Sequence, residues 1–225
     1  LKEALDFQLL NQSLSDKGEI LYSFVHDKVI ETLNSHMSHQ KLKKLHRLAA
    51  QMIEETIQSQ DKIYALAHHY MLADQRKEAY EYNILAGDLA KESFSLKLAA
   101  GFYHQAYEVL NKFTTKGNKS IQNKIELALK IVKMNFQLGN QKANVKLLEA
   151  IIPELKEKKE EKLLANIYYW TAKSFYLMGD QVKATNYYYL LIPLAEKLNI
   201  PELLGLPYCA IGRLHCFLAN FQQSF

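Results

Sequence analysis

Three basic residues recur along this chain at a fixed step of forty residues: Lys133, Lys173 and Arg213. An aromatic ring stands three residues after each of the first two, as Phe136 and Tyr176, and Cys216 stands three residues after the third. Because residues three apart share one helix face, each of the first two cations would lie beside a ring. Cations form charge-assisted hydrogen bonds with carboxylates and phosphates. The spacing therefore predicts a surface that holds an acidic or amphipathic peptide, or an anionic ligand. A repeated solvated face would give the same spacing.

Histidine and cysteine do not form a metal-binding pattern. The groups considered are His36 with His39, His68 with His69, and Cys209 with His215 and Cys216. Zinc needs about four converging nitrogen or sulfur ligands, and none of these groups offers them, so no metal site is expected. His26 and His46 are expected to be hydrogen-bonded packing residues that join a strand to the first helices.

Catalysis and nucleotide binding also find no support in the residue pattern. There is no nucleophile elbow and no nucleophile with a base and an orienting group around it. The phosphate loop G-x-x-x-x-G-K-[ST] is absent. We therefore expect no catalytic residues and no cofactor, and ATP only through an upstream domain that lies outside this sequence.

Composition bounds the class of protein. Of the 225 residues 48% are hydrophobic, with four Pro and eight Gly, and Lys, Glu, Leu, Ala and Gln favour helices. A net charge of +4 spread along the chain does not favour direct nucleic-acid binding. No apolar run approaches the ~20 residues of a membrane span. Reduced thiols at Cys209 and Cys216 suit a cytoplasmic protein. The chain starts without Met and stops inside a helical pattern, which suggests a segment of a larger protein.

Apolar periodicity predicts helices over most of the chain. The expected ranges are 27–33, 42–57, 61–73, 77–93, 97–113, 120–138, 142–157, 160–178, 182–198 and 203–218, with a last helix from Phe221. Ile20 to Val25 is a strand candidate and is expected to pair with Leu9 to Ser13 as a hairpin. The longest expected loop is Thr114 to Asn118.

The forty-residue step of the basic residues is shared by other parts of the sequence. Ile151-Ile152-Pro153 is echoed by Leu191-Ile192-Pro193, and Gly139-Asn140 by Gly179-Asp180 and more weakly by Ala219-Asn220. A fixed period of this size is typical of stacked helical repeats. An earlier block around Ala99 fits with a step of 45. Pro153 and Pro193 are expected to end or kink their helices. A plain helical bundle is the alternative.

The block around Tyr168 resembles the tetratricopeptide repeat. It has Tyr168, Ala172 and Phe175, then Gly179-Asp180, then Ala184-x3-Tyr188. The resemblance implies an all-α fold, a superhelical stack of antiparallel helix hairpins, in which the first helices line a concave groove. It implies a partner-binding groove formed by Lys133, Phe136, Lys173, Tyr176 and Arg213. Tyr187, Tyr188 and Tyr189, with Tyr168 and Trp170, are expected to form the core between repeats.

The first half resembles the region after the ATPase core of STAND-type signalling ATPases. The motifs are Tyr22-Ser23-Phe24-Val25-His26, then Leu45-His46-Arg47-Leu48-Ala49, then Leu66-Ala67-His68-His69-Tyr70, in that order. The resemblance implies the end of a winged-helix-like module at 1–40, a helical linker with the first hairpins at 41–115, and repeats at 120–225.

These expectations point to a non-catalytic regulatory arm that binds a protein or peptide. Two alternatives stay open. One is a free-standing repeat scaffold. The other is a regulatory segment of a nucleotide cyclase or of a Ser/Thr or histidine kinase.

Overall fold

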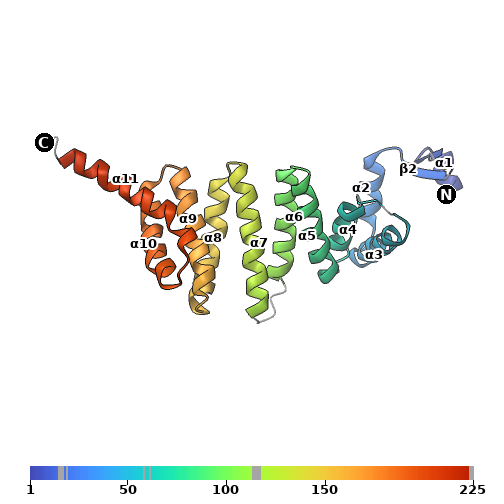
Figure 1. Cartoon of the computed structure of the whole chain (residues 1–225). Coiled ribbons are helices and arrows are strands. Elements are labelled where there is room, and N and C mark those ends of the chain that lie inside the picture. Colours follow the sequence, from blue (N-terminus) through green and yellow to red (C-terminus); the bar gives the residue numbers. More distant parts are fainter. Residues whose placement is uncertain (15–17, 19, 58, 61, 113–117, 223–225) are drawn as a thin grey trace. The chain divides into compact units, whose positions relative to one another are not determined.

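The computed structural model is helical apart from one small β-hairpin, over the part of the chain that it describes (Figure 1). It describes residues 1–14, 18, 20–57, 59–60, 62–112 and 118–222, without the side chains of 118–120 and 217–222. The strands are Leu10–Leu14 (β1) and Ile20–Phe24 (β2). The helices are Lys2–Asp6 (α1), Asp27–His36 (α2), His39–Thr56 (α3), Lys62–Leu72 (α4), Arg76–Glu92 (α5), Leu96–Lys112 (α6), Asn118–Gln137 (α7), Gln141–Glu157 (α8), Glu161–Leu177 (α9), Gln181–Lys197 (α10) and Gly205–Gln222 (α11), with a 3₁₀ turn at Pro201–Leu203 (η1).

The chain divides into two compact units, Leu1–Ala79 and Tyr80–Phe225. In the first, β1 and β2 pair antiparallel with Gln12 opposite Tyr22, which confirms the expected hairpin. Helices α3 and α4 pack against each other. The winged-helix interpretation and the division at residues 40 and 115 stay predictions. Of the expected loop at Thr114 to Asn118, residues 114–117 lie outside the described part, and Asn118 already begins α7.

The second unit is a stack of helices of uniform length. Helices α5, α6, α8, α9 and α10 each have 17 residues. Each helix from α6 to α11 packs against its neighbour in the chain. Figure 1 shows α6 to α10 side by side with alternating direction. This arrangement confirms the all-α stack of antiparallel hairpins.

Backbone turns of one kind separate the helices. Residues in the left-handed region stand twenty apart at Gly139, Lys159, Gly179 and Asn199. At the first of them the amide of Asn140 donates to the Asn135 carbonyl at 2.8 Å, a six-residue closure that satisfies the end of α7. The forty-residue period is therefore two such helix-and-turn units.

One expectation about helix ends was wrong, and of the two outcomes expected at the prolines the helix end does not occur. The predicted break at Ala219-Asn220 does not occur, because α11 runs through to Gln222. The left-handed conformation that Gly139 and Gly179 adopt costs a residue with a Cβ roughly 1–2 kcal/mol. Pro153 and Pro193 do not end their helices, which continue to Glu157 and Lys197.

Burial explains why α8 continues past its proline. Leu148, Ile151 and Leu155 lie on both sides of Pro153 and are almost fully buried. Each such side chain contributes roughly 1.5–3 kcal/mol. Their sum is comparable to or larger than the ~3 kcal/mol that an interior proline costs.

Candidate protein-interaction face on the first helices

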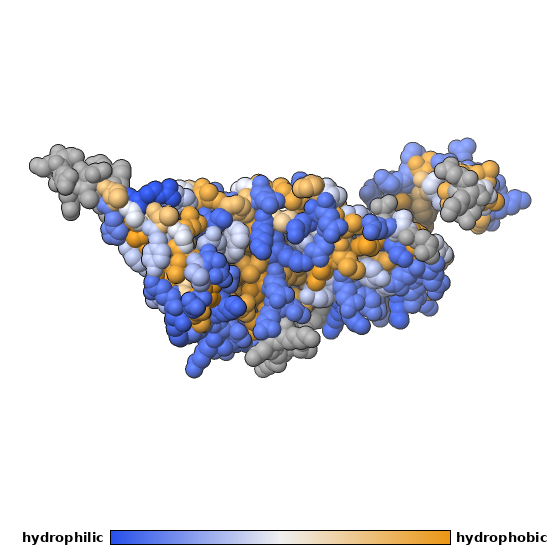
Figure 2. Space-filling model, in the orientation of Figure 1, coloured by the Kyte–Doolittle hydropathy of each residue, from blue (hydrophilic) through white to orange (hydrophobic). Residues whose placement is uncertain are grey.

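The repeated cations lie on α7, α9 and α11, the first helices of successive hairpins. Helices α7 and α9 contact each other directly. The repeated cations that meet rings define a surface that we call the cation–ring face. Its members are Phe136, Tyr169, Trp170, Lys173, Tyr176 and Arg213. Figure 2 shows that the surface over α7 to α11 mixes hydrophilic and hydrophobic residues in this view.

Lys173 is held among three aromatic rings. Its Nζ lies 4.5 Å from the centroid of Phe136, 4.9 Å from that of Trp170 and 5.6 Å from that of Tyr169. Phe136 belongs to the preceding repeat and meets Trp170 edge to face, with centroids 5.7 Å apart. Each cation–ring contact at a partly exposed site is worth about 0.5–1 kcal/mol. The rings therefore orient the ammonium without neutralising its charge.

Arg213 repeats this arrangement one step further along. Its guanidinium carbon lies 5.6 Å from the centroid of Tyr176, again a ring of the preceding repeat. Its Nε donates to the carbonyl of Cys209 at 3.3 Å. A pocket of about 340 Å³ beside it is lined by Tyr176, Gln181, Ala210, Arg213 and Leu214.

Lys133 does not share this geometry. It is exposed and has no ring contact among the described residues. The forty-five-residue step explains the difference, since the residue that precedes Phe136 by this step is Lys91 and not an aromatic residue. The structure therefore brings Lys173 to Phe136 and Arg213 to Tyr176, and leaves Lys133 apart.

Within the described residues, none of the three cations forms an ion pair. The ion pairs of this unit join other lysines to acids, such as Lys124 to Glu154 at 2.8 Å and Lys197 to Glu161 at 2.7 Å. The cation–ring face therefore carries positive charge that no acidic side chain of the described part neutralises.

Asp88 stands in the earlier block at the position that Lys133, Lys173 and Arg213 take in the later blocks. The Tyr103 hydroxyl donates to its Oδ1 at 2.6 Å, and the Lys130 ammonium donates to both oxygens at 2.7 and 3.0 Å. Burial alone would raise the pKa of the Asp88 carboxyl, but the hydrogen bonds from Lys130 and Tyr103 outweigh it and hold the pKa below its usual value. Here the charges neutralise one another.

The tyrosines expected in the core differ in their burial. Tyr188 is fully buried, and burial with the neighbouring Tyr169 and Tyr176 raises its pKa to about 12. Its hydroxyl makes no hydrogen bond in the described part. Tyr187 is half-buried and donates to Glu149 at 2.9 Å. Tyr189 is 54% exposed, so placing it in the core was wrong; the residue next to Tyr188 on a helix points to another face.

Trp170 and Tyr169 were not predicted as part of the site. Trp170 was expected in the core, whereas it is half-buried and packs on Phe136 and Lys173. Their spacing contained the signal, because Tyr169 and Trp170 precede Lys173 by four and three residues and so share its helix face.

A second cluster lies in the first unit, where three imidazoles meet between α3 and α4. His46 Nδ1 lies 2.9 Å from His69 Nδ1, and the ring of His68 is 6.1 and 5.3 Å from theirs. Burial, followed by the neighbouring imidazoles, lowers the pKa of His46 and His69. His46 thus joins α3 to α4 rather than the strand to the first helices. Within the described residues, neither these imidazoles nor any other group of three His, Cys, Asp or Glu side chains is arranged to hold a metal ion.

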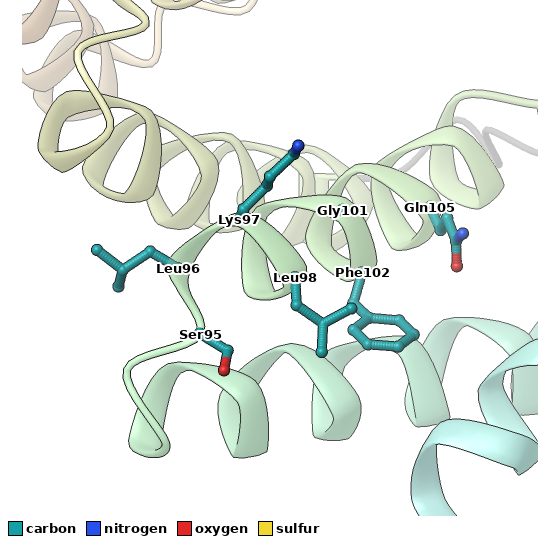
Figure 3. Close-up of a pocket in the computed structure, with 7 residues that line it drawn as sticks. All are labelled: Ser95, Leu96, Lys97, Leu98, Gly101, Phe102 and Gln105. Atoms are coloured by element: carbon teal, nitrogen blue, oxygen red, sulfur yellow. The ribbon is translucent and has the colours of Figure 1, made fainter.

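An apolar pocket of about 590 Å³ opens on α6. Leu98 and Phe102 lie side by side on one side of the helix, and Lys97 points to the other (Figure 3). Leu98 is 48% exposed. Gly101 leaves the pocket open, since a Cβ there would meet nothing within 4 Å.

None of the helices in the described part combines the length and the apolar character that crossing a bilayer requires.

No protein-family model and no curated protein sequence matches this chain. Solved structures do match its fold. The crystal structure of apo RapI aligns at 10% identity with a TM-score of 0.53, over 88% of this chain and 58% of RapI. A Rap protein complexed with Competence and Sporulation Factor aligns at 13% identity and a TM-score of 0.48, over 88% of this chain and 57% of that one. A putative kinesin light chain from Podospora anserina with TPR-like repeats aligns at 12% identity and 0.44, over 76% and 93%.

The chain thus spans less than two thirds of the Rap proteins that it resembles. The likeness concerns the fold, and it agrees with the uniform helices and repeated turns: the chain is an all-α, TPR-like stack of helix hairpins.

Proposed function

We propose that this chain is a non-catalytic protein-interaction arm that holds an acidic or amphipathic peptide segment on the cation–ring face. One observation carries the proposal. Lys173 and Arg213 stand at the same register of successive repeats, each lies over a ring of the repeat before it, and neither is ion-paired in the described part. Carboxylates would bind the cations, and apolar side chains would pack on the rings.

Stacked repeats suit this role. Each hairpin contacts its neighbours, so a surface of aligned first helices is extended and repeats along the stack. The expected partner is a protein or peptide rather than a nucleic acid or a membrane, because the net charge of +4 is small for a chain of this length.

The test is charge reversal. We expect Lys173→Glu combined with Arg213→Glu to weaken binding of the partner by at least about tenfold, because two attractive contacts become repulsive. The partner would be isolated with the wild-type chain and its affinity measured by calorimetry. Circular dichroism should show unchanged helicity. Equal affinity of the double variant and the wild type would contradict the proposal.

The larger context proposed for this arm is a cytoplasmic signal-transduction ATPase of the STAND type. The ordered motifs around Phe24, Leu45 and Leu66 support it, and the free thiols of Cys209 and Cys216 agree with a reducing compartment. A partner that prefers one state of the arm could then bias the nucleotide switch. The flanking sequence tests this: a phosphate loop upstream supports it, and a cyclase or kinase domain at either end supports that alternative instead.

A further inference from the structure

The pocket beside Arg213 combines one cation with polar and apolar walls. It has a volume of about 340 Å³ and lies where residues of α9, α10 and α11 meet. Ala210 and Leu214 supply apolar surface, and Gln181 supplies an amide at the first residue of α10. The N-terminal end of a helix carries partial positive charge. The nearby carboxylate of Asp180 caps this end and pairs with Lys183 at 3.3 Å, so its charge is already balanced.

Two contacts orient the guanidinium of Arg213, whose side chain is exposed. Its carbon lies 5.6 Å from the Tyr176 centroid, and its Nε donates a hydrogen bond to the Cys209 carbonyl. The terminal N–H donors have no hydrogen-bond partner among the described residues. An arginine oriented in this way presents the parallel donors that match the two oxygens of a carboxylate.

We infer that this pocket is a carboxylate anchor, which takes one carboxylate of the bound peptide on the two terminal nitrogens of Arg213. The inference deepens the proposed function and rests on it. The carboxylate comes from an Asp or Glu side chain or from a chain terminus. The pocket has a single cation and otherwise neutral walls, and it therefore suits a monoanion better than a phosphate dianion.

The experiment uses short fluorescein-labelled peptides of alternating Glu and Leu. One has a free C-terminus, one an amidated C-terminus, and one has Gln in place of Glu. Fluorescence anisotropy with the wild-type chain gives their affinities. Weaker binding of the amidated peptide identifies the chain terminus as the source, and weaker binding of the Gln peptide identifies the side chains.

Variants of the pocket complete the test. We expect Arg213→Gln to lower affinity about tenfold or more, since a hydrogen bond to a charged group is lost. Arg213→Lys keeps the charge but loses the paired donors, so its affinity should fall in between. The matched control is Lys146→Gln, the same loss of charge at an exposed site on α8, and it should bind as the wild type does.

The outcomes separate the anchor from the proposed function. If Lys173→Glu weakens binding but Arg213→Gln does not, the face binds peptide and the anchor is wrong. If neither amidation nor Gln substitution changes the affinity, the anchor is wrong as well. If no peptide binds at millimolar concentrations, both are overturned. Circular dichroism of each variant excludes a loss of folding.

Discussion

Lys130 and Lys173 both lie over aromatic rings in the same helical stack, but their charges meet different surroundings. Lys130 lies 5.1 Å from the Tyr103 centroid and bonds both oxygens of Asp88. Lys173 lies among Phe136, Tyr169 and Trp170, and no carboxylate of the described residues forms an ion pair with it. The first cluster closes on itself and contributes to stability. The second keeps its charge available, which is what binding requires.

The register makes the comparison sharper. Asp88 precedes Lys133 by the same forty-five residues that separate Ala99 from Asn144. One position of the repeat thus carries an acid in the earlier block and a base in the later blocks. A block with an acid at this position pairs its charges internally. A block with a base at the same position presents a cation instead.

The largest expected effect concerns Tyr188, the fully buried ring on α10. Tyr188→Ala should lower the free energy of unfolding by ~3 kcal/mol, because it removes a large, fully buried side chain. Urea unfolding followed by circular dichroism measures this. The control is Tyr189→Ala at the exposed neighbour, which should change stability by less than about 0.5 kcal/mol. Equal effects of the two substitutions would contradict the burial pattern.

The next effect tests the close packing around Tyr103, which belongs to the neutral cluster of Asp88, Tyr103 and Lys130. A Cβ on Gly87 would lie 2.5 Å from Cε1 of Tyr103, so Gly87→Ala must displace that ring and should cost about 2 kcal/mol. Gly101→Ala is the matched control in α6, where a Cβ meets nothing. It should stabilise the protein by roughly 0.5–1 kcal/mol through helix propensity. The same sign for both substitutions would show that the contact with Tyr103 does not limit residue 87.

A third test compares a buried tyrosine hydroxyl that has a hydrogen-bond partner with one that has none in the described part. Tyr103 donates to Asp88 at 2.6 Å, whereas the Tyr188 hydroxyl has no partner in the described part. Tyr103→Phe should cost about 1–2 kcal/mol. Tyr188→Phe should be neutral or slightly stabilising, since it removes a buried polar group without a hydrogen bond. Thermal unfolding of the two variants decides between these expectations, and a loss for Tyr188→Phe as large as for Tyr103→Phe would show that its hydroxyl has a partner in solution.

The smallest effect is the pH dependence of the stability that Asp88 contributes. The pKa of Asp88 is lowered in the folded chain, so the carboxylate binds fewer protons there than in the unfolded chain. Its contribution is therefore present above the unfolded pKa of about 4 and is lost as the pH falls through the lower, folded value. Solvent exposure limits it to less than about 1 kcal/mol. Urea titrations from neutral pH to pH 3 should show a smaller loss in Asp88→Asn than in the wild type. An equal loss in both proteins would show that Asp88 does not contribute to the loss of stability in acid.

The pattern of apolar residues and glycines was sufficient to predict the helices from α2 to α10, the hairpin at Leu10–Leu14 and Ile20–Phe24, and the turns at Gly139 and Gly179. These features depend on neighbours close in the sequence, through helix periodicity and backbone conformation. The break at Ala219-Asn220 was predicted from similarity to those turns. It failed because positive φ costs a residue with a Cβ more than it costs glycine, and Ala219 stays within α11.

For the site, the sequence by itself determined the register of Lys133, Lys173 and Arg213, since a forty-residue period follows from residue identities alone. Only the tertiary structure decided which ring meets which cation, because Phe136 and Tyr176 act on the following repeat, across the contact between first helices. It also decided that Trp170 joins the site, that Lys133 stays apart, and that the Tyr188 hydroxyl has no partner. Contacts between repeats depend on how helices distant in the sequence pack, and the spacing within one helix does not contain that information.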